Sequence, residues 1–217
     1  MANFMINGAS QKETHFFDLF HERGVRWYHR HFDFKAGSLS GECTPFYLMH
    51  PEAPKRAYRY NPGLKLIAIL RNPTERAWSH YLMNREAQRE QLSFTEALAS
   101  EDKRLAESSD ITDPNSNFLH FSYQHRGRYA EQLDHWLNYF SPEQLLVINY
   151  HDFFRDPWQA VQEVYRFLGA APLYDTILHH ENSGKLKDNI PPEAAKSLND
   201  YFREPNAQLA KKYGIRF

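Results

Sequence analysis

The sequence predicts an α/β fold with a central, mainly parallel sheet flanked by helices. Two short apolar runs, at 65–70 and 144–150, have the length and composition of buried strands. Segments at 128–140 and 158–168 carry apolar residues at helical spacing. Strands that alternate with helices along a chain are typical of a mainly parallel sheet that helices cover.

The N-terminal quarter is expected to hold short elements separated by turn residues. A first strand is expected at Phe4–Ile6, and an amphipathic segment at Tyr28–Phe32. The stretch Gly41–Tyr47 is expected to be a strand end followed by a turn. A helix is expected at Pro51–Arg59, and the sequence Asn-Pro-Gly at 61–63 predicts another turn.

The run Lys65–Leu70 is followed by the signals of a helix start. The run is apolar along its length, which predicts a strand covered on both faces. Asn72 is a favourable N-cap, Pro73 suits the first helical position, and Glu75 can close a capping box onto Asn72. The helix is expected to run to about Gln88.

This strand-to-helix junction is the strongest candidate for a binding site. Arg71 stands at the carboxyl end of the strand, beside the positive end of the helix, where α/β folds bind anions. Ser79 lies about two turns along the helix, on the same face as Asn72 and Arg76. A guanidinium and a hydroxyl that converge there would suit a phosphate group.

The C-terminal part is expected to be largely helical around the strand at 144–150. The expected elements are a helix at 94–105, a polar loop at 107–117, helices at 128–140 and at 158–168 with Gly169 as its C-terminal stop, a helix from Pro191-Pro192 to about Phe202, and a short helix from Asn206.

Composition narrows the class of protein. The 217 residues suit a single domain, 1–217, and 26 basic against 27 acidic residues argue against a nucleic-acid binder. The single cysteine, Cys43, excludes an intrachain disulfide and favours a reducing compartment, so we expect a cytoplasmic protein. No apolar run reaches the ~20 residues of a membrane span. The sequence leaves the oligomeric state open.

The junction resembles a known motif. Arg-Asn-Pro-x-x-Arg-Ala-x-Ser-x-Tyr, from Arg71 to Tyr81, is similar to the 3′-phosphate-binding motif of sulfotransferases that use 3′-phosphoadenosine 5′-phosphosulfate (PAPS). The resemblance extends over nearly the whole chain. It implies a P-loop kinase-like three-layer fold, PAPS as co-substrate, no required metal, and a 3′-phosphate held by Arg71 and Ser79.

A second segment resembles heparan-sulfate-type sulfotransferases. Lys-Glu-Thr-His-Phe-Phe-Asp, at 12–18, matches a segment in which the glutamate is the catalytic base. The resemblance implies that Glu13 deprotonates the acceptor, and that His15 and Asp18 help to orient it. In an extended segment Glu13 and His15 would point to the same side, and a carboxylate within hydrogen-bond reach can take the acceptor proton.

Three further segments add candidates. Gly41–Tyr47 resembles the family's Glu-Lys-Thr-Pro-x-Tyr turn, which makes Glu42 a candidate substrate contact. The alternatives for Glu42 are that it orients its neighbours or is simply a turn residue. Cys43 stands where relatives often carry a lysine, a departure that bears on anionic-glycan specificity.

The other two segments concern the donor nucleotide. Arg126 belongs to an Arg-Gly-x-Tyr segment that lies near the nucleotide in the family. Gly184 and Lys185, with Lys187 as the alternative lysine, stand where relatives close a loop over the phosphates.

One family element is absent from the sequence. The Gly-x-x-Lys-x-Gly-Thr-Thr loop that binds the 5′-phosphosulfate has no counterpart, because Gly8 to Gln11 runs directly into Lys12-Glu13. Roughly two dozen residues, a loop and an ordinary helix, are expected there. Either the printed chain omits a segment near 8–11, or the loop is truly deleted.

The sequence therefore predicts transfer of a sulfuryl group from PAPS to a hydroxyl or amine. The acceptor stays open among carbohydrates, lipid-like chains and small metabolites. The alternative is a degenerate member that binds the 3′-phosphoadenosine nucleotide without turnover. A nucleotide kinase-like transferase is a further alternative, against which the segments at 12–18 and 71–81 argue.

Overall fold

The computed structural model describes residues 5–108, 110–171 and 189–217. The chain divides into two compact units. Unit 1 comprises Met1–Ala68, His135–Leu146 and Asp152–Ile177, and unit 2 comprises Ile69–Asp134, Val147–His151 and Leu178–Phe217. The sequence-based assignment of 1–217 to one domain stays a prediction.

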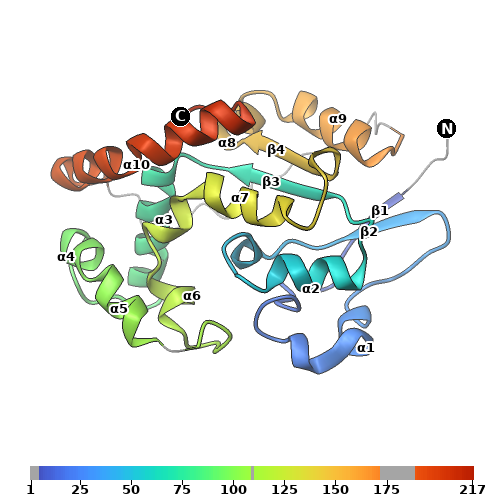
Figure 1. The fold of residues 1–217 in the computed structure, drawn as a ribbon, viewed down its shortest axis with the longest axis horizontal. Helices are drawn as coiled ribbons and strands as arrows, with labels where there is room; N and C mark the ends of the chain where they lie inside the picture. The colour runs from blue at the N-terminus through green and yellow to red at the C-terminus, as the bar shows by residue number, and fades with distance from the viewer. Residues whose placement is uncertain (1–4, 109, 172–188) are drawn as a thin grey trace. The chain divides into compact units, whose positions relative to one another are not determined.

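Strands and helices alternate along the chain (Figure 1). The strands are β1 (Met5–Gly8), β2 (Ser38–Gly41), β3 (Leu66–Leu70) and β4 (Leu145–Asn149). The α-helices are α1 (Gly24–His29), α2 (Ala53–Tyr60), α3 (Pro73–Glu86), α4 (Phe94–Ala99), α5 (Glu101–Glu107), α6 (Asn117–Phe121), α7 (Tyr129–Leu137), α8 (Tyr150–Arg155), α9 (Pro157–Leu168) and α10 (Pro192–Tyr213). Short 3₁₀ turns are η1 (His21–Arg23), η2 (Pro45–Leu48), η3 (His125–Gly127) and η4 (Pro142–Gln144).

The strands pair in two parallel ladders. β1 and β2 run parallel in the register Met5–Ser38 to Gly8–Gly41. β3 and β4 are hydrogen-bonded neighbours, and their arrows point the same way in Figure 1. The α/β class with a parallel sheet flanked by helices is thus confirmed.

The β3 strand corrects one expectation. Leu70 is buried, but the side chains of Ile67 and Ile69 are 40% and 47% exposed. Successive side chains of a strand point to opposite faces, so one face of β3 is buried and the other is not. A run of apolar residues does not show this alternation, and the prediction of burial on both faces was wrong.

Each unit has its own aromatic-rich core. In unit 1 the buried cluster contains Phe16, Phe17, Tyr28, Ala53, Ala57, Trp136 and Phe140. In unit 2 it contains Ala77, Tyr81, Phe94, Ala97, Leu98, Tyr123, Ala194, Leu198 and Phe202. The first cluster fixes the segment that carries Glu13 and His15, and the second fixes the helix that follows Arg71.

Several helix boundaries match the sequence signals. The Asn72 side chain accepts hydrogen bonds from Thr74 N and Glu75 N, as an N-cap does. Gly169 ends α9 with φ 72°, in the left-handed region that glycine favours. The expected helix at 94–105 is instead two helices. Ser93 and Glu96 form a capping box at the start of α4, and α5 begins after Ser100. Helices α6 and α8 were not predicted.

Helix α10 also differs from the expectation. The sequence predicts a break between Phe202 and Asn206, but the helix continues through Pro205 to Tyr213. A proline inside a helix costs about 3 kcal/mol. Phe202 and Leu209, seven residues apart and both buried, anchor the two sides of Pro205 on one face and offset that cost. No helix within the described ranges is long and apolar enough to cross a membrane.

Candidate functional site

Unit 1 brings Glu13, His15 and Asp18 together. His15 Nδ1 lies 2.9 Å from Asp18 Oδ2, and His15 Nε2 lies 3.3 Å from Glu13 Oε2. Side-chain exposure rises along the row, from 0% for Asp18 through 18% for His15 to 39% for Glu13. The buried Asp18 carboxylate therefore holds one side of the imidazole, and the Glu13 carboxylate lies on the other side, nearer to solvent.

The local backbone differs from the extended segment that the sequence suggested. His15 has φ 51°, in the left-handed region, which non-glycine residues rarely adopt. The two side chains meet because the chain turns at His15, so the expectation of an extended segment was wrong while the pairing of Glu13 with His15 was right.

The electrostatics of this cluster favour a charged imidazole. Burial acts to lower the pKa of His15, but hydrogen bonds to Asp18 and Glu13 outweigh it and raise the pKa to about 9. At neutral pH the site therefore holds an imidazolium between two carboxylates.

Asp18 is the buried end of the row. Its Oδ1 accepts a hydrogen bond from Leu19 N at 2.6 Å, and its Oδ2 faces His15. Arg56 Nη1 donates to the carbonyl oxygens of Phe17 and Asp18. These contacts make Asp18 a support for His15, and its predicted contact with the acceptor stays a prediction.

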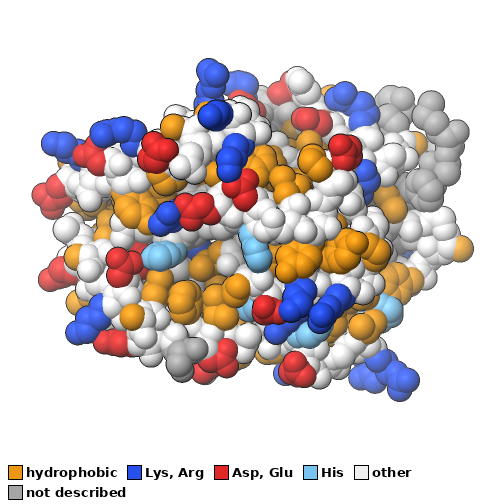
Figure 2. Space-filling view, in the orientation of Figure 1, with side chains coloured by type: hydrophobic (Ala, Val, Ile, Leu, Met, Phe, Trp, Pro, Cys, Tyr) orange, Lys and Arg blue, Asp and Glu red, His pale blue; other side chains and the backbone are white. Residues whose placement is uncertain are grey.

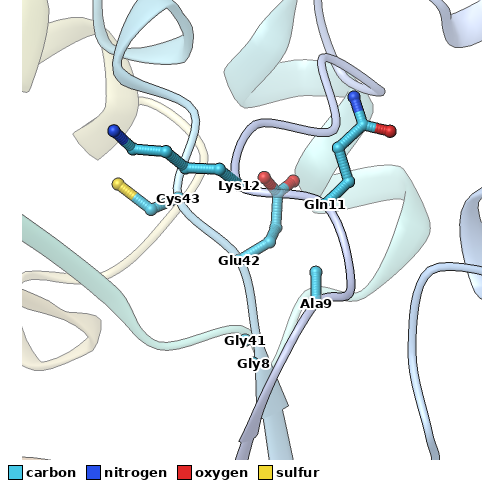
Figure 3. A pocket seen from close by; sticks show the side chains of 7 residues that line it. All are labelled: Gly8, Ala9, Gln11, Lys12, Gly41, Glu42 and Cys43. Carbon is cyan, nitrogen blue, oxygen red and sulfur yellow. The ribbon is translucent and has the colours of Figure 1, made fainter.

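A hollow of about 320 Å³ lies beside this cluster, at the carboxyl ends of β1 and β2. It is lined by Gly8, Ala9, Gln11, Lys12, Gly41, Glu42 and Cys43 (Figure 3). In Figure 3 the side chains of Lys12 and Cys43 point in the same direction. Desolvation, followed by the charges of Glu13 and Glu42, raises the pKa of the Cys43 thiol, which disfavours the nucleophilic thiolate.

The backbone at this junction has its donors in use. Ala9 N donates to Gly41 O at 3.0 Å, and Ser10 N donates to His31 O at 2.7 Å. A phosphate-binding loop presents such N–H groups to its ligand instead. Whether a segment belongs between Gly8 and Gln11 stays a prediction, but Ala9 N and Ser10 N are not available to bind an anion.

In unit 2, Arg71, which is predicted to bind the donor nucleotide, lies at the carboxyl end of one of two neighbouring strands. Arg71 follows β3, while Tyr150 and His151 follow β4. Arg71 Nε donates to Glu75 Oε2 at 3.0 Å, its guanidinium lies 5.3 Å from the Tyr150 ring centroid, and His151 Nε2 lies 3.3 Å from the same Glu75 oxygen. Glu75 thus bridges two potential cations.

This bridge corrects the predicted capping box. The Glu75 carboxylate turns toward Arg71, whose charge attracts it more strongly than the Asn72 N–H does, and it also lies beside His151 Nε2. Sequence reasoning missed Tyr150 and His151, although two polar residues at the carboxyl end of the predicted strand were a usable signal.

Ser79 and Arg126, the other described residues that are predicted to bind the donor nucleotide, differ in exposure and contacts. Asn72, Arg76 and Ser79 follow the spacing of one face of α3, as predicted. Ser79 is exposed there, whereas the Arg76 side chain donates to the carbonyl of Tyr123. Arg126 donates to Ser122 Oγ at 3.0 Å and to Leu119 O at 2.8 Å. It thereby caps the carboxyl end of α6, as a cation does favourably there.

A buried carboxylate and a glycine fix the turn that carries Arg126. Glu101 is fully buried and accepts hydrogen bonds from Gln124 N and His125 N, at 2.7 and 2.9 Å. A Cβ on Gly127 would lie 2.5 Å from the Phe202 ring and 2.8 Å from Pro73 Cβ. Only glycine fits this approach of α10 and α3, which explains the Arg-Gly pair.

Two predicted site residues, Gly184 and Lys185, lie outside the described residues, as does Lys187. In the parts that the structure describes, no group of three or more His, Cys, Asp or Glu side chains is arranged to hold a metal ion.

Comparison with known proteins places these features in context. Residues 49–211 match the family model described as "Sulfotransferase domain". The crystal structure of a sulfotransferase from Alicyclobacillus acidocaldarius resembles this chain with a TM-score of 0.79 and 30% identity, over 98% of this chain and 87% of that one. The likeness confirms the predicted P-loop kinase-like fold class.

Curated relatives agree with this match. Human heparan sulfate glucosamine 3-O-sulfotransferase 6 is 36% identical over 74% of this chain and 44% of its own length. Human bifunctional heparan sulfate N-deacetylase/N-sulfotransferase 3 is 29% identical over 96% of this chain and 27% of its own length. The chain thus spans less than half the length of either relative.

Proposed function

This chain belongs to the sulfotransferase domain family, and we propose that it transfers a sulfuryl group from PAPS to a hydroxyl or amine of a carbohydrate acceptor. The observation that carries the proposal is the row Glu13–His15–Asp18, in which a partly exposed carboxylate lies beside a fixed imidazolium. We propose a carbohydrate acceptor because the names of the relatives describe them as heparan sulfate sulfotransferases.

In the proposed reaction Glu13 takes the proton of the acceptor hydroxyl or amine. The acceptor oxygen or nitrogen forms a bond to sulfur while the bond from sulfur to the 5′-phosphate oxygen breaks. The products are the sulfated acceptor, adenosine 3′,5′-bisphosphate and a protonated Glu13. A base within hydrogen-bond reach contributes roughly 10²–10⁴-fold to such a step.

On the donor side, Arg71 and Ser79 are proposed to hold the 3′-phosphate. The position of Arg71 supports this, because it follows a strand, precedes the N-terminus of α3, and is oriented by Glu75 and Tyr150. A bidentate guanidinium suits a phosphate group. Arg126 and Lys185 stay proposed nucleotide contacts, and Asp18 stays a proposed acceptor contact.

A second candidate function is binding of the 3′-phosphoadenosine nucleotide without turnover. It is favoured by the junction at residues 8–11, where Ala9 N and Ser10 N are already hydrogen-bonded to carbonyl oxygens. Sulfuryl transfer needs hydrogen-bond donors that stabilise the negative charge developing on the leaving phosphate.

Transfer of label from radiolabelled PAPS distinguishes the two candidates. The acceptors are a heparan-derived oligosaccharide, its desulfated form and a neutral oligosaccharide. Glu13→Gln is compared with Glu22→Gln, which changes an exposed carboxylate of unit 1. We expect the wild type and Glu22→Gln to label an acceptor, and Glu13→Gln to be slower by about 10²-fold or more.

Equal rates for the two variants would contradict the role of Glu13. Saturable nucleotide binding without labelling of any acceptor would favour the second candidate.

A further inference from the structure

Three consecutive backbone N–H groups of the Glu13–His15–Asp18 segment are bound by side-chain hydroxyls. His15 N donates to Thr44 Oγ1 at 3.3 Å, Phe16 N to Tyr47 Oη at 2.7 Å, and Phe17 N to Tyr47 Oη at 3.2 Å. The hydroxyls come from a segment about 30 residues further along the chain, so this contact is tertiary. These side-chain hydroxyls take the place of the backbone carbonyls to which the N–H groups would bond in a sheet.

Glu42 determines which way those hydroxyls point. Thr44 Oγ1 donates to Glu42 Oε2 at 2.8 Å, and Tyr47 Oη donates to Glu42 Oε1 at 2.8 Å. A hydroxyl has one proton, so donating it to the carboxylate leaves the oxygen lone pairs for the backbone N–H groups. We call the set Glu42, Thr44 and Tyr47 the Glu42 bridge.

Within the Glu42 bridge, Tyr47 stays a hydrogen-bond donor. Burial, with the nearby charge of Glu42, raises the pKa of Tyr47, so its hydroxyl keeps the proton that it donates. Tyr28 Oη also donates to Glu42, at 3.3 Å. Both carboxylate oxygens thus have protein donors, although Glu42 lines the hollow (Figure 3).

The segment that the bridge holds needs an external support. His15 is in the left-handed region at φ 51°, a conformation that persists where the surroundings fix it. The distances from His15 to Glu13 and Asp18 depend on that turn. A loss of the N–H contacts at 15–17 would let the turn relax and the row of side chains separate.

We infer that Glu42, acting through Thr44 and Tyr47, is a positioning residue that holds the Glu13–His15–Asp18 row in register, and does not itself contact the acceptor. The catalytic consequence of this inference rests on the proposed function, whereas its structural consequence does not. Of the roles that the sequence left open for Glu42, the inference selects the one in which it orients its neighbours.

The test compares Tyr47→Phe with Tyr58→Phe. Tyr58 belongs to α2 and is 42% exposed, and within the described residues its hydroxyl has no hydrogen bond, so this control removes the same atom without touching the bridge. The readouts are the NMR titration of the His15 ring, hydrogen exchange of the Phe16 and Phe17 amides, and kcat and KM with PAPS and acceptor.

We expect Tyr47→Phe to lower the pKa of His15 from about 9 toward its ordinary 6.5. The amides of Phe16 and Phe17 should exchange at least roughly tenfold faster. In an active enzyme kcat should fall on the order of 10–100-fold with little change in the KM for PAPS. Tyr58→Phe should match the wild type in all three measurements.

Glu42→Gln is the second variant, because it preserves shape and tests the bridge if Tyr47→Phe does not fold. We expect a smaller shift in the same direction, since one amide oxygen replaces two carboxylate acceptors. Folded variants with an unchanged His15 titration and protected amides would overturn the inference. A shifted titration in a chain that labels no acceptor would support the inference and overturn the proposed function.

Discussion

His15 and Asp18 form a 2.9 Å contact between Nδ1 and Oδ2 in which the carboxylate is shielded completely from solvent. The contact fixes the ring and leaves Nε2 for Glu13, and the two carboxylates together raise the pKa of His15 to about 9 against the effect of burial.

The stability of the protein should therefore fall in mild alkali. The folded-state pKa of His15 lies above its ordinary 6.5, so the stabilisation is complete below about 6.5 and is lost as the pH rises through about 9. We expect a loss of about 2 kcal/mol in the free energy of unfolding across that window.

Urea unfolding of the wild type and of His15→Gln over this range measures the loss. The difference between the two proteins should shrink as the pH rises. A difference that stays constant with pH would mean that His15 is not held as an imidazolium.

Glu75 should compete with a bound phosphate for Arg71. Its carboxylate is about one-third exposed and pairs with Arg71 and His151. Pairs of this exposure contribute roughly 0.2–1 kcal/mol, so Glu75→Gln should strengthen binding of adenosine 3′,5′-bisphosphate by at most about fivefold. Isothermal titration calorimetry measures this. A weaker affinity in Glu75→Gln would show that Glu75 orients Arg71 more than it competes for it.

Gly127 should not tolerate a side chain. An added Cβ would lie 2.5 Å from Phe202 and 2.8 Å from Pro73 Cβ, both in the packed interior of unit 2. Gly127→Ala should destabilise the protein by about 1–3 kcal/mol. Gly41→Ala is the control, because nothing lies within 4 Å of its added Cβ. Equal midpoints of urea unfolding for the two variants would contradict the close approach.

The sequence predicted helix ends correctly where residues within one turn determine them. Asn72 and Pro73 begin α3, and Gly169 ends α9, because caps act within one turn of the helix. The same logic was wrong at Pro205, because the packing of Phe202 and Leu209 is tertiary and outweighs the local signal.

The site shows the same division. The segment at 12–18 identified Glu13, His15 and Asp18, and the structure brings them together. The residues that hold them, Thr44 and Tyr47, are about 30 positions away, and no spacing rule connects them. Likewise, the pairing of Glu75 with His151 depends on two strands lying side by side, which a capping-box pattern does not encode.

The most direct test of the account is whether the chain recognises a 3′-phosphate through Arg71. Thermal unfolding is measured with adenosine 3′,5′-bisphosphate and with adenosine 5′-phosphate, for the wild type, Arg71→Ala and Arg155→Ala. Arg155 is an exposed arginine paired with Asp152, and serves as the control. A free ligand concentration of about 100 times the Kd stabilises the native state by roughly 2.7 kcal/mol.

The account predicts a higher midpoint for the wild type and Arg155→Ala with the 3′-phosphorylated compound alone, and no shift for Arg71→Ala. Equal shifts with both nucleotides, or a shift that survives Arg71→Ala, would contradict it.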